Sequence, residues 1–239
     1  MIYITGDKHG RYSDVMAFCY DNETNKDDML IILGDAGINY NLDYRDFNLK
    51  KTLSCLPITL FCIHGNHEER PENIKTYETM KYHNGIVYVE EKYPNILFAK
   101  DAEVYDIDGL DTLVIGGAYS VDKDRRVAMG MKWYPSEQPN ELTKENVRNK
   151  LKENDYKVDV ILSHTCPYKY LPTEMFLPYI DQSKVDKSTE MFLDEIEEKT
   201  LYQRWYCGHY HTDKTIDKIQ FMMYDIDEFG KKLVKKKRN

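Results

Sequence analysis

The chain has 239 residues, enough for one large α/β domain or two small ones, and its 41% apolar and 31% charged residues are typical of a soluble globular protein. It has no run of about 18 apolar residues, which excludes a membrane-spanning helix, and it enters an apolar segment at once without a charged leader, so we expect no signal peptide. Six of the 33 basic residues lie in the last nine positions. The rest of the chain therefore has 27 basic against 41 acidic residues and a formal charge of −14. Such a charge repels polyanions except where metals or local arginines reverse the electrostatic field.

The first 70 residues alternate apolar runs with stretches of helical periodicity. We predict helices from Ser13 to about Tyr20 and from Tyr44 to about Ser54. The strands predicted around them are 2–6, 29–33 and 58–63. Strands that are separated by helical crossovers indicate a parallel sheet.

From Ile86 the chain changes to short strands without helices between them, and Asp108-Gly109 is a tight hairpin signal. We expect this part to be antiparallel or to belong to a second sheet. Two further helices are predicted, at Glu141 to Lys152 and near Ser188 to Lys199. The strands predicted in this half are 86–90, 96–99, 103–107, 111–116, 158–162, 204–207, about 215–220 and about 221–226.

Two stretches lack clear periodicity, Ala118 to Asn140 and Thr165 to Lys184. Long loops in a compact domain are more often functional than idle. We therefore expect these two loops to flank the functional site and to determine substrate selectivity.

Ligand-type residues follow five of the apolar runs, and five of the seven histidines lie among them. The blocks are Asp7-Lys8-His9-Gly10, Gly34-Asp35, Gly65-Asn66-His67-Glu68, Ser163-His164 and Gly208-His209-Tyr210-His211. Residues at strand ends in an α/β protein converge on one edge of the sheet, where such sheets bind ligands. The blocks therefore predict a single site.

The residue types in these blocks suit a pair of metal ions. If the segments stay extended, Asp7 and His9 point to the same side, and so do His209 and His211, because strand side chains alternate. The carboxylate of Asp35 has two oxygens and can bridge cations about 3.5–4 Å apart. With Asn66 and His164 the set is mixed nitrogen and oxygen without thiolate, which favours Mn²⁺, Fe, Zn²⁺, Co²⁺ or Ni²⁺ over Mg²⁺ or Ca²⁺.

In order and spacing the five blocks resemble those of the calcineurin-like metallophosphoesterases, which read D-x-H, G-D, G-N-H-[ED], H and G-H-x-H. The resemblance spans residues 5 to 211. It implies a four-layer α/β/β/α sandwich with two facing mixed β-sheets, and hydrolysis of phosphoric esters with two divalent transition-metal ions, of which we favour Mn²⁺.

The resemblance also implies a role for each residue. Asp35 would bridge the two ions, His67 would protonate the leaving-group oxygen, and Glu68 would orient His67 or cap the following turn. The ligands of the first ion would be Asp7, His9 and His211, and those of the second Asn66, His164 and His209.

One block departs from part of the family. Members that hydrolyse phosphoproteins or dinucleoside polyphosphates continue the second block as G-D-x-V-D-R-G, whereas residues 34–40 here contain no arginine. Arg125 and Arg126 are the best candidates to replace it, because guanidinium groups clasp phosphate oxygens bidentately. A solvated charge cluster from Asp122 to Arg126 is the alternative for this segment.

We therefore expect a phosphodiesterase that acts on a nucleotide or a nucleic-acid-derived substrate, with a phosphomonoesterase or protein serine/threonine phosphatase as alternatives. A non-catalytic metal-binding scaffold is disfavoured, because such a protein would be expected to lose ligands or His67. The sequence does not determine the physiological substrate or the oligomeric state.

The ligand blocks occupy both ends of the chain, which indicates one domain at 1–230 followed by a basic flexible tail at 231–239. The basic tail could touch nucleic acid or an anionic membrane, although a solvated terminus is the preferred interpretation. Five cysteines without a Cys-x-x-Cys pair favour reduced thiols and a cytoplasmic location.

Overall fold

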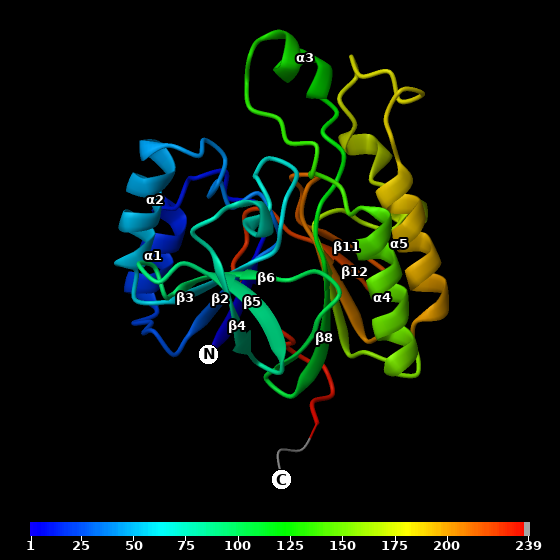
Figure 1. The fold of residues 1–239 in the computed structure, drawn as a ribbon. Helices are drawn as coiled ribbons and strands as arrows, with labels where there is room; N and C mark the ends of the chain where they lie inside the picture. Colours follow the sequence, from blue (N-terminus) through cyan, green and yellow to red (C-terminus); the bar gives the residue numbers. More distant parts are fainter. Residues whose placement is uncertain (237–239) are drawn as a thin grey trace.

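The computed structural model describes residues 1–236 (Figure 1). Its helices are α1 (Ser13–Asp21), α2 (Tyr44–Ser54), α3 (Lys123–Ala128), α4 (Glu141–Glu153) and α5 (Ser188–Lys199), with short 3-10 turns η1 (Pro71–Asn73), η2 (Tyr168–Tyr170) and η3 (Thr173–Met175). The strands are β1 (Ile2–Thr5), β2 (Met29–Ile32), β3 (Thr59–Cys62), β4 (Glu78–Tyr82), β5 (Gly85–Val89), β6 (Ile96–Ala99), β7 (Val104–Ile107), β8 (Leu110–Ile115), β9 (Val160–Ser163), β10 (Arg204–Cys207), β11 (Lys214–Ile216), β12 (Ile219–Phe221) and β13 (Asp227–Glu228).

The strands form two mixed sheets. The seven-stranded sheet has the order β13-β1-β2-β3-β6-β5-β4, and the six-stranded sheet has the order β11-β12-β10-β9-β8-β7. In each sheet the central strands pair in parallel and the outer strands are antiparallel. The parallel start and the antiparallel middle are thus both confirmed.

Three buried clusters divide the molecule into four layers. One cluster lies between the two sheets and includes Leu33, Phe61 and Leu162. A second packs α4 and α5 onto the smaller sheet, and a third packs α1 and α2 onto the larger sheet (Figure 1). The α/β/β/α sandwich expected from the sequence is confirmed.

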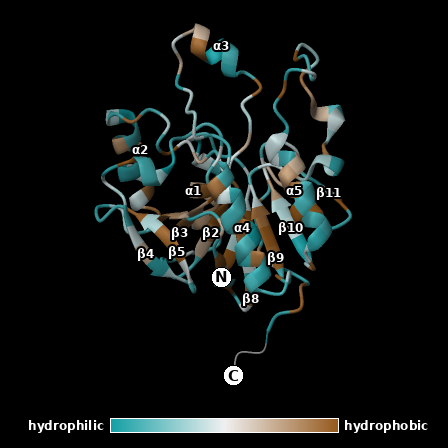
Figure 2. Ribbon diagram, turned by 45° about the vertical axis from the view of Figure 1, so that its right-hand side comes forward, coloured by the Kyte–Doolittle hydropathy of each residue, from teal (hydrophilic) through white to brown (hydrophobic). Residues whose placement is uncertain are grey.

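The central strands are apolar along their whole length because both of their faces are covered. In β2, Met29 and Ile31 face the other sheet while Leu30 and Ile32 face the helices. Figure 2 shows the same division, with apolar strands inside and largely hydrophilic helices outside. This rigid interior holds the carboxyl ends of the strands in place.

Side-chain caps determine where two of the helices begin. The Asp43 carboxylate accepts a hydrogen bond from Arg45 N at the start of α2, and Asn140 Oδ1 accepts one from Thr143 N at the start of α4. Such caps pair backbone N–H groups that the helix leaves without a partner. Among the described residues, no helix is long and apolar enough to cross a bilayer.

Three local predictions differ from the structure. The predicted strands 215–220 and 221–226 are wrong, because the chain turns at Asp217, whose φ is +52°, and forms the hairpin of β11 and β12. Strand β4 was not predicted because it is an edge strand with four exposed residues and little apolar patterning. Helix α3 lies inside the stretch 118–140 and has no buried residue that would give an apolar periodicity.

The predicted tail begins at 231, and its described part follows the surface of the domain. The backbone N–H of Lys236 donates to Gly109 O at 3.0 Å, and Val234 N donates to Gln203 Oε1 at 2.9 Å. Lys235 and Lys236 form ion pairs with Asp108 and Asp111. Residues 237–239 lie outside the described part, and the domain boundary at 230 stays a prediction.

Candidate metal centre

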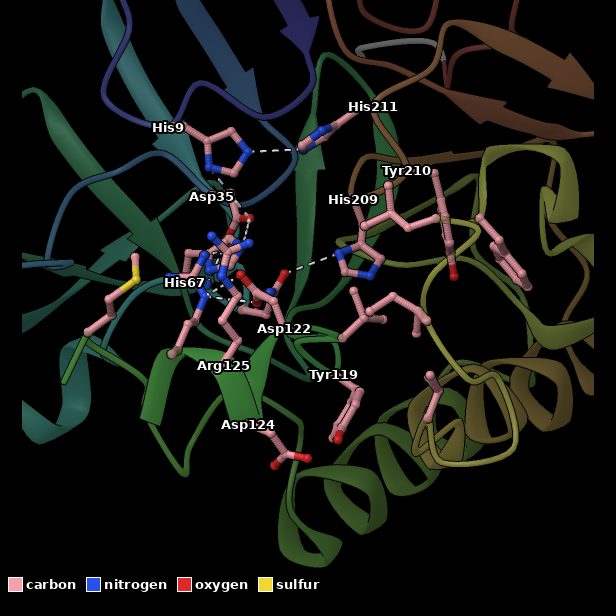
Figure 3. A pocket seen from close by; sticks show the side chains of 18 of the residues that line it. His9, Asp35, His67, Tyr119, Asp122, Asp124, Arg125, His209, Tyr210 and His211 are labelled. Carbon is pink, nitrogen blue, oxygen red and sulfur yellow. Dashed lines mark hydrogen bonds and ion pairs between the residues drawn. The ribbon is translucent and has the colours of Figure 1, made fainter. Parts of the chain in front are cut away.

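The five ligand blocks meet at one edge of the sandwich, between the two sheets. Figure 3 shows His9, Asp35, His67, His209 and His211 gathered there. Three of them follow the parallel strands β1, β2 and β3 of the larger sheet, and two follow β9 and β10 of the smaller sheet. The structure thus brings together all eight residues predicted for metal binding and proton donation: Asp7, His9, Asp35, Asn66, His67, His164, His209 and His211.

The first cluster consists of Asp7, His9 and His211, whose ligand atoms lie within 4.8 Å of one another. Asp7 Oδ2 is 3.3 Å from His211 Nε2 and 3.8 Å from His9 Nε2, and the two imidazole nitrogens are 3.0 Å apart. Asp7 is 2% exposed, and its Oδ2 has no hydrogen-bond partner of good geometry among the described residues. A buried anionic oxygen that faces two imidazoles fits a cation.

The second cluster surrounds the amide oxygen of Asn66. His164 Nε2 lies 2.8 Å and His209 Nδ1 3.1 Å from Asn66 Oδ1. Ser120 was not predicted for this cluster, and it accepts a hydrogen bond from Asn66 Nδ2 at 2.8 Å, so that the oxygen of the amide faces the imidazoles. The only sequence signal for Ser120 is its place in a loop without periodicity.

Asp35 lies between the two clusters. Its Oδ2 is 3.7 Å from His164 Nε2 and 3.9 Å from His9 Nδ1, so one carboxylate faces a histidine of each cluster. Its Oδ1 accepts a hydrogen bond from the backbone N–H of His67 at 2.9 Å. This position is the one that a bridging carboxylate requires.

Backbone contacts orient the ligands. His164 Nδ1 lies 2.7 Å from Leu33 O, which leaves Nε2 to face the cluster. Histidines that bind metals usually donate their second ring N–H to a carbonyl or carboxylate in this way. The Glu68 carboxyl group accepts a hydrogen bond from Gly65 N at 3.0 Å and so caps the turn of its own block rather than the following turn that was expected.

Two glycines of the blocks are required by close packing. A Cβ on Gly34, whose φ is +95°, would lie 2.1 Å from His164 Nδ1. A Cβ on Gly65 would lie 2.1 Å from the backbone nitrogen of Asp35. Only a residue without a side chain lets these ligand loops approach each other.

The ligands do not extend from strands, and the expected alternation of side chains is wrong. Strand β1 ends at Thr5 and β10 at Cys207, before the ligand pairs begin. His9, Asp35, His209 and His211 all have left-handed backbones, with φ of +46°, +46°, +66° and +51°. Strained backbone of this kind clusters at functional sites.

Electrostatics keep Asp7 and Asp35 anionic and His209 neutral. Burial would raise the pKa of Asp7 and Asp35, but His164 beside Asp7 and His67 beside Asp35 hold both below their usual range. Burial lowers the pKa of His209 to about 3. These are the protonation states in which such groups bind cations.

A cavity of about 1100 Å³ opens beside the clusters (Figure 3). Its walls include Tyr119 and Met131 from the stretch 118–140, and Phe176 and Ile180 from the stretch 165–184. The prediction that these two stretches flank the site is confirmed. In Figure 1 they rise above the sheets, one with α3 and the other beyond η3.

The two candidate arginines line this cavity but differ in their surroundings. Arg126 Nη2 lies 3.4 Å from His67 Nε2, and Arg126 Nη1 donates to Tyr40 Oη at 3.2 Å. Arg126 Nε also donates to both oxygens of Asp122 at 2.8 Å, so the predicted charge cluster forms here as well. Arg125 is exposed.

Comparison with known proteins gave one positive result. The family model described as calcineurin-like phosphoesterase matches residues 1–213, which cover every ligand block. No curated protein matches the chain.

Proposed function

Since the chain belongs to the calcineurin-like phosphoesterase family, whose members are metal-dependent hydrolases of phosphoric esters, we propose that it is a phosphodiesterase acting on a nucleotide or a nucleic-acid-derived substrate. The observation that carries the choice of a diester is that the arginine beside His67 already has an acidic partner. Residues 34–40 contain no arginine, and Arg126 is paired with Asp122.

Two divalent ions fit the donor set. Asp7, His9 and His211 would hold one ion, Asn66, His164 and His209 the other, and Asp35 would lie between them. Four imidazoles, two carboxylates and one amide favour Mn²⁺, with Fe, Zn²⁺, Ni²⁺ and Co²⁺ as alternatives. Such ions, when bound, draw charge from phosphoryl oxygens and lower the pKa of a nucleophilic water.

His67 is the proposed proton donor to the leaving group. Its ring lies at the cavity, with Nε2 3.7 Å from Asp35 Oδ2, while its backbone N–H donates to the same carboxylate. Asp35 therefore positions His67 and would also help to hold the two ions. A proton delivered from this ring to a departing alkoxide is general acid catalysis.

The net charge of the body of the chain also favours a diester. A diester carries one negative charge fewer than a dianionic monoester, so it needs less positive charge beyond the two ions. The body of the chain outside its basic end has a formal charge of −14, with 27 basic and 41 acidic residues, and it repels acidic phosphopeptides.

One observation favours a phosphomonoesterase as the second candidate. Arg126 lies next to His67, and it could grip a terminal phosphate if the substrate displaces Asp122. A protein serine/threonine phosphatase has less support, because residues 34–40 lack the arginine that family members of that kind carry in the second block. A non-catalytic scaffold has the least support, because every predicted ligand and His67 are present.

The experiment compares kcat/KM of the Mn²⁺-loaded protein on bis(p-nitrophenyl) phosphate and on p-nitrophenyl phosphate, followed by a cyclic nucleotide and a phosphopeptide. We expect the diester to be the better substrate of the first pair. A clear preference for the phosphopeptide would contradict the proposal and favour a protein phosphatase.

The cysteines support a cytoplasmic location as part of this proposal. All five are free, and four of them are buried. Free thiols persist in a reducing compartment.

A further inference from the structure

The cavity is larger than a phosphate group requires. Its volume of about 1100 Å³ is slightly above the range of about 300–1,000 Å³ that is typical of sites for small organic ligands. Residues of the two candidate ligand clusters line one part of the cavity. The rest of the cavity extends along the stretch 165–184 to the start of α5. The cavity therefore has room for the organic ester group of a substrate beside the phosphate.

The walls of this second part are mainly apolar. Leu171, Phe176, Ile180 and Val185 line it, and each is half-buried. Met131 lines the cavity from the stretch 118–140. Apolar walls suit a flat ring or another apolar group, with a few polar side chains to fix its orientation.

Glu190 is the polar group whose state is unusual. It lines the cavity, yet it is only 4% exposed. Its Oε1 accepts a hydrogen bond from Thr165 Oγ1 at 2.8 Å, and its Oε2 is buried without a hydrogen-bond partner among the described residues. Buried polar atoms without a partner are rare and call for an explanation.

Two structural roles explain only part of this arrangement. Glu190 lies in the first turn of α5, where the helix dipole favours a carboxylate. The hydroxyl groups of Tyr210 and Thr165 lie 3.0 Å apart, so a hydrogen-bond chain leads from Tyr210 through Thr165 to Glu190 and joins α5 to two ligand loops. Both roles use Oε1 or the charge, and neither gives Oε2 a partner.

We propose that Glu190 is a specificity-determining residue whose carboxyl group at the cavity wall hydrogen-bonds an N–H group on the ester group of the substrate, a flat nitrogen heterocycle of the nucleobase type. The apolar walls would cover the faces of the ring, and the carboxyl would meet its polar edge. An acyl chain has no donor to offer and would leave the carboxyl without a partner from the substrate. This inference rests on the proposed function, because the phosphate must sit at the metal clusters for the ring to reach Glu190.

The protonation of Glu190 agrees with this role. Burial raises the pKa of Glu190 to about 7. At neutral pH the carboxyl can therefore accept a hydrogen bond when ionised or donate one when protonated, and the edges of nucleobases present both N–H groups and carbonyl oxygens.

Two diesters that release the same p-nitrophenolate test the proposal. Thymidine 5′-(p-nitrophenyl phosphate) has a ring N–H, whereas bis(p-nitrophenyl) phosphate has none. Glu190→Gln and Glu190→Leu are compared with the wild type, and Glu198→Gln, an exposed change on the same helix, is the control. We expect the ratio of kcat/KM for the thymidine ester to that for the other ester to fall about tenfold or more in Glu190→Leu, as for the loss of a hydrogen bond to a charged group. The ratio should fall less in Glu190→Gln, whose amide oxygen still accepts a hydrogen bond, and it should stay constant in the control.

Other results would overturn the proposal. Equal losses on both esters would assign Glu190 only to holding the ligand loops, and no loss on either would leave it without a role in the site. Leucine has a volume similar to that of glutamate but no polar group, whereas glutamine keeps a polar group of the same shape. If one of the two variants fails to fold, the other still tests the proposal.

A titration separates this inference from the proposed function. Thymidine 5′-monophosphate is titrated into the Mn²⁺-loaded wild type and into both variants by calorimetry, with inorganic phosphate as the reference probe. If the variants bind the nucleotide more weakly than the wild type but bind phosphate equally well, the role of Glu190 is supported, even if neither diester is hydrolysed. A lack of hydrolysis of both diesters would refute only the proposed phosphodiesterase activity. Unchanged nucleotide binding would refute the role of Glu190.

Discussion

At the scale of single residues, neighbouring groups hold three residues of the site in place. The backbone carbonyl of Leu33 holds His164, Ser120 holds Asn66, and the Asp35 carboxylate takes the backbone N–H of His67. The candidate ligands could be predicted from the sequence, because the blocks D-x-H, G-D, G-N-H and G-H-x-H occur together and in order, and each names particular residues. The holding groups could not, because a carbonyl or a serine in a loop has no distinguishing pattern.

The first residue-scale prediction concerns His67. If it protonates the leaving group, His67→Ala should slow esters with alkoxide leaving groups by about 10²–10⁴-fold, whereas esters of p-nitrophenol should slow less because that leaving group needs little help. The measurement is kcat on both kinds of diester. The control is His83→Ala, which removes an exposed imidazole outside the site. Equal losses on the two esters would assign His67 to binding or structure.

At the scale of elements, the loops after the strands bring the ligands together by strained backbone and close approach. The strand pattern located the loops correctly, since the blocks follow β1, β2, β3, β9 and β10. The geometry within the loops differs from the extended geometry that strand alternation implies, because four ligand residues have positive φ. Such conformations depend on contacts between distant segments, which a single sequence does not show.

Gly34 tests this account of the ligand loops. In Gly34→Ala the φ of +95° and a Cβ at 2.1 Å from His164 Nδ1 must both be accommodated. A left-handed backbone at a residue other than glycine typically costs about 1–3 kcal/mol by itself. We therefore expect Gly34→Ala to lower the free energy of unfolding, measured by urea titration, by more than this amount. Gly130→Ala is the matched control, because Gly130 has a φ of +65° with nothing within 4 Å of its Cβ position. Equal destabilisation by the two changes would contradict the close-approach argument.

The short helix α3 gives a second element-scale prediction. Arg126 faces His67, whereas the neighbouring Arg125 is exposed at the cavity wall. Losing a charge-assisted hydrogen bond typically costs about 1.5–3 kcal/mol, so Arg126→Gln should lower kcat/KM on the monoester p-nitrophenyl phosphate by about ten- to a hundredfold and on bis(p-nitrophenyl) phosphate less. Arg125→Gln should lower it less. A larger loss in the Arg125 variant would reverse the assignment of the two arginines.

At the scale of the whole molecule, the sandwich and the position of the site could be predicted, and the shape of the cavity could not. Alternating strands and helices determine a sheet whose carboxyl edge gathers the blocks. The stretches 118–140 and 165–184 lack periodicity. From this we could predict that they lie beside the site, but not that they help to enclose a cavity of about 1100 Å³. For the same reason Glu190 was not among the predicted site residues, since its burial depends on packing between α5 and the loop that contains Thr165.

The central claim is that the chain hydrolyses phosphodiesters with two divalent ions held by the converging blocks. The most direct measurement is hydrolysis of bis(p-nitrophenyl) phosphate by chelator-stripped protein as Mn²⁺ is added back, with metal analysis of the same samples. We predict no turnover in the chelator, and recovery that is complete at two ions per chain and greater with Mn²⁺ than with Mg²⁺, because four imidazoles disfavour a hard, strongly hydrated ion. Full activity in excess chelator, with no bound transition metal, would contradict the account.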